Sequence, residues 1–440
     1  MKIDIDRNGE MIMLVMFRVK NFASFKDETI LDLRAVSYKE MKSHIVRIDK
    51  NNLVKTLAIY GKNASGKSNL VSAMYYFKSF IINQMYRDIT NKEEEDTFRI
   101  PGIHRNPYRL NVNLNKENEF EIIFYHNCKT YQYGFSTIEE NGKYLIKEEW
   151  LLKDNVEIYN RNYEHIRFGK KYEKELKKII NKRKDRLYIS VLDYFSDGEI
   201  KEIIDDIKFY LKYKFIIHFE IFIETSIKGL LSNVNFSKRL INDNNYRSKV
   251  EKFLQIADVG IKRIDIEEIL DEETNEHQRY KIKTIHDIFN DENEVIGEEA
   301  FDLKMESTGT IRYFSFIQNM LDMMEKGGVF IVDELTARLH PILTKFIIDL
   351  YQNEKNNKAQ LIFTTHDISL LNRQQFRRDE IAFVDKNKKG ESTVFTLADI
   401  KVRSDASFSK DYLFGKYGAI PVINEQDMTE EILEEWIWGD

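Results

Sequence analysis

The sequence predicts an α/β protein in which a phosphate-binding loop joins a parallel strand to a helix. It also predicts an antiparallel β segment and an inserted helical block. First, an apolar strand over 54–60 runs into a glycine-rich loop and then into a helical pattern. Second, apolar strands over 329–332 and 361–365 end in polar residues, as buried parallel strands do at a ligand-binding edge. Third, apolar and polar residues alternate through 118–160, with Asn141-Gly142 as a hairpin turn, which is typical of an antiparallel meander.

The glycine-rich loop has the pattern G-x-x-x-x-G-K-S and spans 61–68. Gly61 and Gly66 let successive backbone N–H groups face a phosphate, and the following helix adds its N-terminal positive charge. Lys67 is expected to reach the β and γ phosphates of ATP, and Ser68 to ligate Mg²⁺. The other predicted nucleotide-binding positions are Ala64 and Ser65, together with Asn63 and Asn69, which shape the loop and have no assigned chemistry. The alternative is a glycine-rich surface turn.

The two later strands supply the remaining candidate catalytic groups. Asp333 and Glu334 end the first of them. Asp333 is expected to hold Mg²⁺ through its water shell, and Glu334 to polarise the attacking water as a general base. His366 follows the second strand, where it would reach the γ-phosphate or hold the catalytic water. Ordinary strand ends and a structural histidine are the alternatives.

Ser307 and Gly309 stand just before a helical pattern that continues through 311–321. A helix N-terminus of this kind can accept an anion. Taken alone, these two residues form no more than a helix cap.

Composition limits the class of protein. The 440 residues are 42% hydrophobic and 32% charged, which suits a globular chain with a large core. The net charge of −6 gives no global electrostatic case for nucleic acid. A single cysteine, Cys128, fits a reducing compartment. The N-terminal apolar run 11–17 is too short to span a bilayer and has acidic residues before it, so we expect a cytoplasmic protein without a membrane partner.

The order of these motifs resembles the ABC-type ATPase head, the class that includes the SMC and RecF ATPases, over about 11–80 and 300–385. At a finer level the chain resembles the AAA-class, ABC-like ATPases of bacterial phage-defence loci, of the RloA and AbiL type. These are related to the ATPase heads of the overcoming-lysogenization-defect proteins. The finer resemblance rests on five segments: 306–310, 333–341, 360–367, 377–379 and 412–421.

The resemblance implies a dimeric ATPase. In ABC heads two protomers sandwich two nucleotides, each between the P-loop of one protomer and the Ser-Gly signature of the other. Carried over, Ser307 and Gly309 would contact the γ-phosphate in trans, so the active unit would be at least a homodimer. Two departures matter: the signature lacks the Leu-Ser-Gly-Gly-Gln of transporters, and Thr336 stands where relatives often have an acidic residue. Gln84 and Gln132 are both candidates for the Gln-loop by position only.

The leading hypothesis is an ATP-hydrolysing switch that controls a separate effector, a nuclease or toxin, in phage defence. Only 19 residues follow Pro421, so we expect no fused Toprim nuclease. One alternative is a RecF-like or SMC-like ATPase of DNA repair or maintenance that binds DNA directly. Another is a protein in which nucleotide serves as static dimer glue.

The expected domains are two halves of one head, 11–160 and 261–423, an inserted helical domain over 161–260, and an acidic tail over 424–440. Residues 161–186 carry eleven Lys or Arg and four acidic residues, a local charge of +7. This basic segment is either a solvated helix face or a contact for DNA, RNA or an acidic partner. The tail is either frayed or an amphipathic docking helix. The basic residues are Arg161, Arg167, Lys170, Lys171, Lys174, Lys177, Lys178, Lys182, Arg183, Lys184 and Arg186.

Overall fold

The computed structural model describes most of the chain. The described residues are 11–38, 40–48, 51–86, 107–112, 117–140, 143–179, 183–219, 234–257, 260–269, 279–337, 339–403 and 406–420. The acidic tail, the expected turn at Asn141-Gly142 and Lys182 of the basic segment lie outside them. None of the helices within these ranges combines the length and the apolar character needed to cross a membrane.

A mixed sheet at the centre of the molecule carries the loop motifs. Among the described residues it has the strand order β11-β15-β16-β5-β17-β18. Neighbouring strands are parallel except for the last pair, β17 and β18. The strands are β11 (Phe215–His218), β15 (Gly328–Val332), β16 (Ala359–Thr364), β5 (Thr56–Tyr60), β17 (Ile381–Lys386) and β18 (Ser392–Thr396).

The central strands are continuously apolar because both faces of the sheet are buried. Leu57 and Ile59 of β5 belong to one hydrophobic core, whereas Ala58 and Tyr60 belong to a second core on the other face. Successive side chains of a strand point to opposite faces, so one strand can contribute to both cores. This confirms the predicted α/β class.

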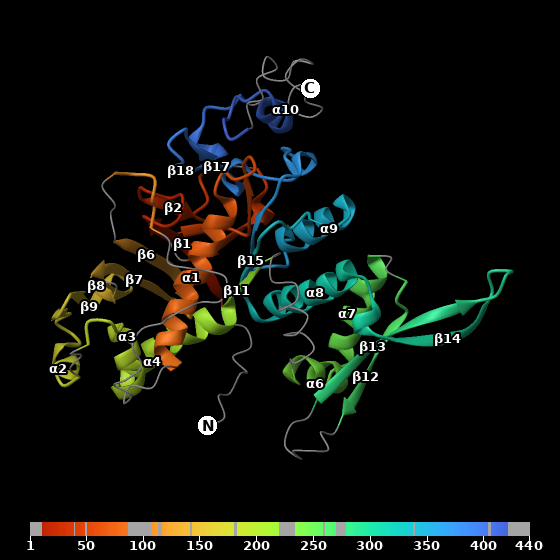
Figure 1. Ribbon diagram of the computed structural model, residues 1–440, viewed down its shortest axis with the longest axis horizontal. Coiled ribbons are helices and arrows are strands. Elements are labelled where there is room, and N and C mark those ends of the chain that lie inside the picture. The colour runs from red at the N-terminus through yellow and green to blue at the C-terminus, as the bar shows by residue number, and fades with distance from the viewer. Residues whose placement is uncertain are drawn as a thin grey trace, which may run out of the picture.

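Helices cover both faces of this sheet (Figure 1). α1 (Lys67–Tyr86) packs Leu70 and Phe77 into the first core. α8 (Thr308–Lys326) and α9 (Pro341–Gln352) pack into the second core. The short helix α10 (Phe408–Leu413) adds Phe408 to that second core. Short 3-10 turns connect other elements: η1 (Lys42–His44), η3 (Leu303–Met305), η4 (Ile368–Leu370), η5 (Arg378–Glu380) and η6 (Leu397–Asp399).

An antiparallel sheet lies beside α1 and confirms the predicted meander. Its order over the described residues is β10-β9-β8-β7-β6-β1-β2. The strands are β1 (Ile12–Lys20), β2 (Thr29–Asp32), β6 (Asn118–His126), β7 (Lys129–Glu140), β8 (Lys143–Lys153), β9 (Val156–Asn162) and β10 (His165–Phe168). A separate ribbon pairs β3 (Ile45–Ile48) with β4 (Asn51–Val54).

The block expected to be a helical insertion, 161–260, also contains strands. β10 extends the antiparallel sheet, and β11 is a parallel neighbour of β15 at the edge of the central sheet. β11 has only four residues, and a run that short cannot be distinguished from a helical segment by its periodicity. The helices are α2 (Glu173–Leu176), α3 (Tyr188–Phe195), α4 (Gly198–Phe209), α6 (Val234–Asn242) and α7 (Asn244–Ile256), with a π-helical turn, η2 (Tyr210–Lys214), after α4. Leu192 of α3 and Ile203 of α4 share a core with α1, so these helices pack on the head.

A three-stranded sheet projects from the body next to α8 (Figure 1). It pairs β12 (Arg263–Ile269) with β13 (Arg279–Phe289), and β13 with β14 (Val295–Asp302). β14 is exposed along most of its length.

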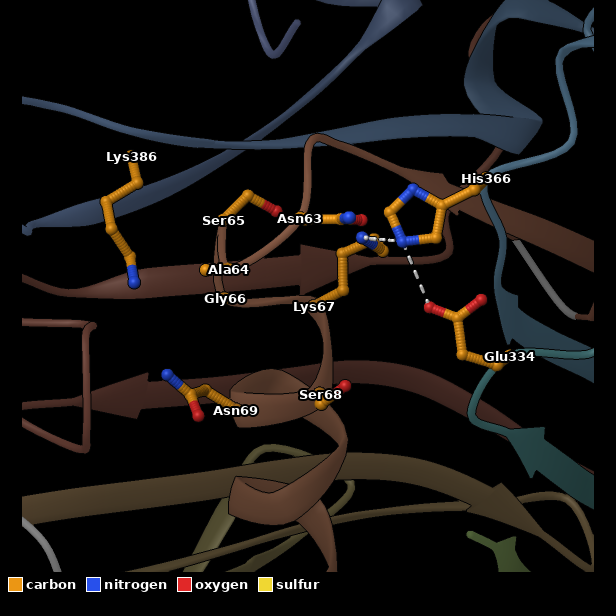
Figure 2. Close-up of a pocket in the computed structure, with 10 residues that line it drawn as sticks. All are labelled: Asn63, Ala64, Ser65, Gly66, Lys67, Ser68, Asn69, Glu334, His366 and Lys386. Carbon is orange, nitrogen blue, oxygen red and sulfur yellow. Dashed lines mark hydrogen bonds and ion pairs between the residues drawn. The ribbon is translucent and has the colours of Figure 1, made fainter. Parts of the chain in front are cut away.

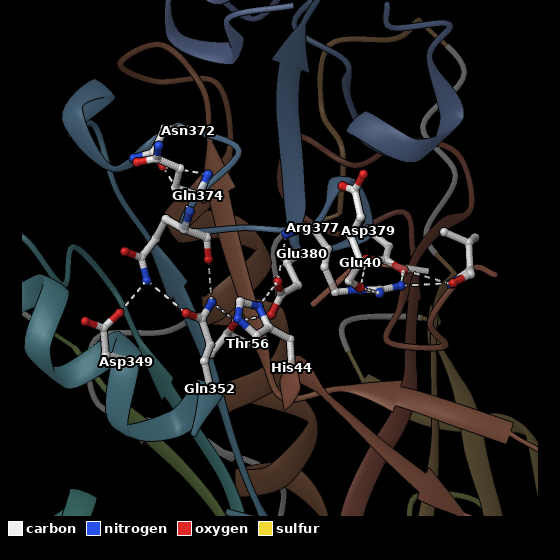
Figure 3. Close-up of polar contacts among 12 residues, drawn as sticks. Glu40, His44, Thr56, Asp349, Gln352, Asn372, Gln374, Arg377, Asp379 and Glu380 are labelled. Carbon is white, nitrogen blue, oxygen red and sulfur yellow. Dashed lines mark hydrogen bonds and ion pairs between the residues drawn. The ribbon is translucent and has the colours of Figure 1, made fainter. Parts of the chain in front are cut away.

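A buried polar cluster ties the two ends of the chain together (Figure 3). The carboxylate of Glu380, which is fully buried, accepts hydrogen bonds from the Thr56 hydroxyl at 2.5 Å and the Arg377 backbone N–H at 2.9 Å, and lies 2.7 Å from His44 Nδ1. Arg377 donates to both oxygens of Asp379, at 2.9 and 2.7 Å. The segment 377–379, part of the family resemblance, therefore joins residues of the N-terminal and C-terminal parts of the chain.

Candidate active site

The carboxyl ends of β5, β15 and β16 meet around one cavity, which is the candidate active site (Figure 2). The cavity has a volume of about 380 Å³. Parallel strands place their ends at the same edge of a sheet, which is why segments far apart in the sequence converge here. The lining residues are Asn63, Ala64, Ser65, Gly66, Lys67, Ser68, Asn69, Glu334, His366 and Lys386.

The loop between β5 and α1 has room only for glycine at two positions. At Gly66, where φ is +118°, an added Cβ would lie 2.6 Å from Ser392 Oγ and 2.8 Å from Ser24 Oγ. At Gly61 it would lie 2.4 Å from the backbone oxygen of Val384. Close contacts therefore fix the loop against its neighbours in the fold. The two glycines also allow its backbone to turn toward the cavity.

Lys67 lies at the first turn of α1 and points into the cavity. Its Nζ donates to the carbonyl oxygens of Gly61 and Lys62, at 2.9 and 3.3 Å, and lies 2.9 Å from His366 Nε2. Burial lowers the pKa of Lys67, and the nearby carboxylates of Glu334 and Asp333 partly offset this effect. The ammonium is therefore placed where a phosphate would be its counter-ion.

Ser68 and Asp333 lie together, as a shared metal site requires. The Ser68 hydroxyl donates to Asp333 Oδ1 at 3.3 Å, and the Thr364 hydroxyl donates to the same oxygen at 2.7 Å. Burial raises the pKa of Asp333, while the bonds from Thr364 and Ser68 oppose the rise. No group of three or more His, Cys, Asp or Glu suited to a metal occurs in the described part of the chain. A hydroxyl and one carboxylate suffice for Mg²⁺ when phosphates and water complete the shell, so these residues fit that ion.

Glu334 is held in a conformation that few residues adopt. Its φ is +55°, a left-handed backbone that costs about 1–3 kcal/mol in a non-glycine residue and is common at functional sites. Its backbone N–H donates to the Thr364 hydroxyl at 2.7 Å, and Arg312 donates to its carbonyl oxygen at 3.4 Å. Thr364 thereby positions both carboxylates of this strand end.

The Glu334 carboxylate faces His366, with 3.2 Å between Oε1 and Nε2. Burial alone would raise the pKa of Glu334, but the hydrogen bond to His366 and the charges of His366, Lys67 and Arg312 outweigh it, and the pKa is lowered. His366 Nε2 can accept a hydrogen bond from Lys67 or donate one to Glu334, but it cannot do both at once. Lys67, Glu334 and His366 thus form one connected set of groups.

The predicted signature residues Ser307 and Gly309 do not line this cavity. Ser307 is exposed and caps α8, because its hydroxyl accepts the Thr310 N–H at 3.0 Å. Just before it, Glu306 Oε1 accepts a hydrogen bond from the Thr284 hydroxyl at 2.5 Å and lies 2.7 Å from His286 Nε2. The side chain of Glu306 therefore links the signature to the middle of β13.

Neither Gln-loop candidate lies near the cavity. Gln84 is buried near the end of α1 and donates to the Asp185 carbonyl at 3.2 Å. Gln132 lies on β7 and donates to Glu121 at 2.9 Å. Gln132 thus joins two strands of the antiparallel sheet, and Gln84 joins α1 to the segment that precedes α3.

Much of the basic segment is engaged within the chain. Arg161 and Arg186 are buried, and Arg161 donates to the Arg186 carbonyl at 2.6 Å. Other members pair with carboxylates: Arg167 with Glu157, Lys171 with Glu199, Lys177 with Glu173, Arg183 with Asp185, and Lys184 with Glu164. These contacts favour the solvated-face interpretation over a nucleic-acid contact.

Sequence reasoning missed two residues of the site. Arg312 lies on α8, well away in sequence from any motif strand, and carried no motif signal. Lys386 lines the cavity from the end of β17. The signal that could have found Lys386 is its place at the end of an apolar strand, 381–384, like that of Asp333.

A comparison with known protein families finds a match over most of the chain. The family described as "AAA domain, putative AbiEii toxin, Type IV TA system" matches residues 57–372, more than two thirds of the chain. No curated protein sequence matches the chain significantly.

Three solved structures are similar. One is an SmcHead bound to the C-winged helix domain of ScpA, with 14% identity, coverage of 87% of this chain and 97% of the other, and a TM-score of 0.45. Another is the SMC head domain from Thermotoga maritima, with 15% identity, coverage of 88% and 99%, and a TM-score of 0.38. The third is the Smc head domain with an extended coiled coil, bound to the C-terminal domain of ScpA, from Pyrococcus furiosus. It has 14% identity, coverage of 92% and 99%, and a TM-score of 0.39. The strand order and the loop geometry described above carry the assignment of the ABC-type head fold.

Proposed function

The chain belongs to this AAA-domain family, and from that premise we propose that it binds ATP with Mg²⁺ and hydrolyses it as a dimeric switch. The observation that carries the proposal is the convergence of Lys67, Ser68, Asp333, Glu334 and His366 at one edge of the central sheet. These are the groups needed to bind a triphosphate, hold a divalent ion and activate water.

Each residue has a distinct role in the proposed reaction. The backbone N–H groups of 63–66 and the Lys67 ammonium bind the phosphates. Ser68 and Asp333 would hold Mg²⁺, which when bound neutralises charge on the β and γ phosphates. Glu334, whose pKa is lowered, is ionised at neutral pH and accepts a proton from the attacking water. His366, whose Nε2 lies 3.2 Å from Glu334 Oε1, holds the Glu334 carboxylate in place.

Mg²⁺-dependent ATP hydrolysis by the purified chain tests this proposal. We expect hydrolysis that Lys67→Ala abolishes, because the Lys67 ammonium is the central cation of the loop. Lys388→Ala, an exposed lysine outside the cavity, is the matched control and should leave the rate unchanged. A parent protein without Mg²⁺-dependent hydrolysis would overturn the proposal.

The position of the signature supports the proposed dimer. Ser307 and Gly309 lie outside the cavity of their own chain, and in the ABC heads that this chain resembles, a signature of this kind contacts the nucleotide of a partner protomer. Mass photometry with Glu334→Gln should then show dimers with ATP and monomers without it. Monomers under both conditions would contradict the sandwich.

We further propose that the switch controls a separate effector, a nuclease or toxin, in bacterial phage defence. The resemblance to the RloA and AbiL type supports this role, as does the family description, which names a toxin of a type IV system. Phage plating on bacteria that express the chain together with its neighbouring gene provides the test. Protection that requires both genes, and that Glu334→Gln removes, is the expected result.

The DNA-binding alternative has less support, because the basic segment is largely engaged within the chain. DNA affinity measured against salt concentration distinguishes the defence switch from the RecF-like, DNA-binding alternative. A steep dependence of the affinity on salt, weakened when Arg183 and Lys184 are neutralised, would favour the RecF-like alternative.

A further inference from the structure

Lys386 is the one lysine besides Lys67 among the residues that line the cavity. It ends β17, which runs parallel to β5, so its backbone stands at the same sheet edge as the phosphate-binding loop. No motif of the family resemblance includes it. The inference below rests on the proposed function, because it concerns the same nucleotide.

The two lysines lie at different parts of the cavity. Figure 2 shows Lys386 beside Ala64 and Gly66, on the side of the loop away from His366 and Glu334. Lys67 lies between these two sides and contacts His366. The loop backbone therefore runs between a catalytic side, with Glu334 and His366, and an opposite side with Lys386.

The surroundings of Lys386 are cationic. Among the described residues, the Lys386 ammonium has no hydrogen-bond or ion-pair partner. Lys62 Nζ donates to the backbone oxygen of Lys386 at 3.2 Å and lies 3.5 Å from Asp385 Oδ1, so the neighbouring carboxylate is already paired with Lys62. Burial lowers the pKa of Lys386, and the charge of Lys62 lowers it further. A partly buried cation beside another cation is stabilised by an anion that reaches it.

We propose that Lys386 binds the phosphate chain of the nucleotide at the end away from the γ-phosphate, and so holds the α- and β-phosphates of ATP and ADP alike. The loop amides and Lys67 then contact the middle of the phosphate chain, and the reacting γ-phosphate lies toward Glu334 and His366. Lys386 contributes to binding affinity and to the choice of a nucleotide with at least two phosphates. It takes no part in the proton transfer at Glu334.

Nucleotide affinities of Lys386→Met test this assignment, with ATP, ADP and adenosine as probes in isothermal titration calorimetry. We expect both ATP and ADP to bind about tenfold more weakly, since a charge-assisted bond to phosphate is lost. Adenosine should show no difference between variant and parent. Lys386→Arg should retain most of the affinity, because the guanidinium also brings a positive charge to the phosphates.

The matched control is Lys388→Met, which removes an exposed lysine from the turn that follows the same strand. It should leave all affinities unchanged, and thermal unfolding of each variant checks that the fold is intact. Unchanged ADP affinity in Lys386→Met would overturn the proposal, whether or not ATP binding is weakened. If the parent binds ATP and Lys386→Met binds ATP and ADP as tightly as the parent does, the proposed ATPase stands and the assignment of Lys386 fails. A parent protein that binds no ATP overturns both proposals.

Discussion

The N-termini of α1 and α8 have similar local chemistry, but one is enclosed by the protein and the other is exposed to solvent. α1 begins at Lys67, which is 4% exposed and enclosed by strand ends of the same chain. α8 begins after Ser307, which is exposed and lies outside the cavity. Both termini offer backbone N–H groups and a hydroxyl to an anion. The N-terminus of α1 is therefore a candidate catalytic site because nearby strand ends supply a lysine, carboxylates and a histidine. The N-terminus alone would not be enough.

The segments that precede α1 and α8 are also fixed by different contacts. The loop before α1 is fixed by the central sheet through close contacts at Gly61 and Gly66. The segment before α8 is held by Glu306, which bonds to Thr284 and His286 of the projecting sheet. The signature is therefore attached to an element that stands away from the body (Figure 1).

The largest expected effect is on the enclosed site. Glu334→Gln removes the proposed base while keeping the shape of the side chain, and kcat should fall by about 10²- to 10⁴-fold. ATP affinity should stay within a few fold of the parent, because the phosphate-binding groups are intact. Single-turnover hydrolysis and equilibrium binding measure the two quantities. A variant that hydrolyses ATP normally would remove Glu334 from the mechanism.

The exposed terminus is tested by mixing two inactive variants. Ser307→Arg should abolish hydrolysis but leave ATP binding to each protomer intact. Lys67→Ala should be inactive because it lacks the central cation of the phosphate-binding loop. In an equal mixture, random pairing leaves about a quarter of the sites with an intact loop and an intact partner signature. We therefore expect about a quarter of the parent ATPase rate on mixing. A mixture as inactive as its components would show that Ser307 does not act in trans.

The polar cluster between the two halves of the head should affect stability and not catalysis. Arg377→Ala leaves the buried Asp379 carboxylate without its ion-pair partner, which typically costs about 3–5 kcal/mol. Urea unfolding measures the loss, and Arg373→Ala, an exposed arginine nearby, is the control. An unfolding free energy equal to that of the control would contradict a role for Arg377 in joining the halves.

The smallest expected effect is a shift in pH dependence. His366 is one of the groups that lower the pKa of Glu334. In His366→Gln that contribution is lost, so the pKa of Glu334 rises and the carboxylate becomes protonated at a higher pH. The acid limb of the pH profile of kcat should therefore move upward. An acid limb that stays in place or moves downward would show that His366 does not hold Glu334 in its ionised form.

Sequence reasoning predicted much of the site because its signals are local. The loop 61–68, the carboxylates Asp333 and Glu334, and His366 each follow directly from an apolar strand. The structure brings residues 63–68, Glu334 and His366 to one cavity, and the Asp333 carboxylate lies 3.3 Å from the Ser68 hydroxyl of that cavity. The trans role of Ser307 and Gly309 stays a prediction, because it depends on a second copy of the chain.

The sequence by itself determined which short segments have the chemistry of a phosphate site, since glycine spacing and strand-end carboxylates are properties of neighbouring residues. The tertiary structure decided how these segments combine. Strand pairing places β5 between β16 and β17, elements about 300 residues later in the chain, and no local pattern specifies that order. The same pairing brings Lys386 to the cavity, makes β11 a strand of the central sheet and leaves Ser307 outside. Contacts between distant segments depend on burial of both sheet faces, which only the folded chain achieves.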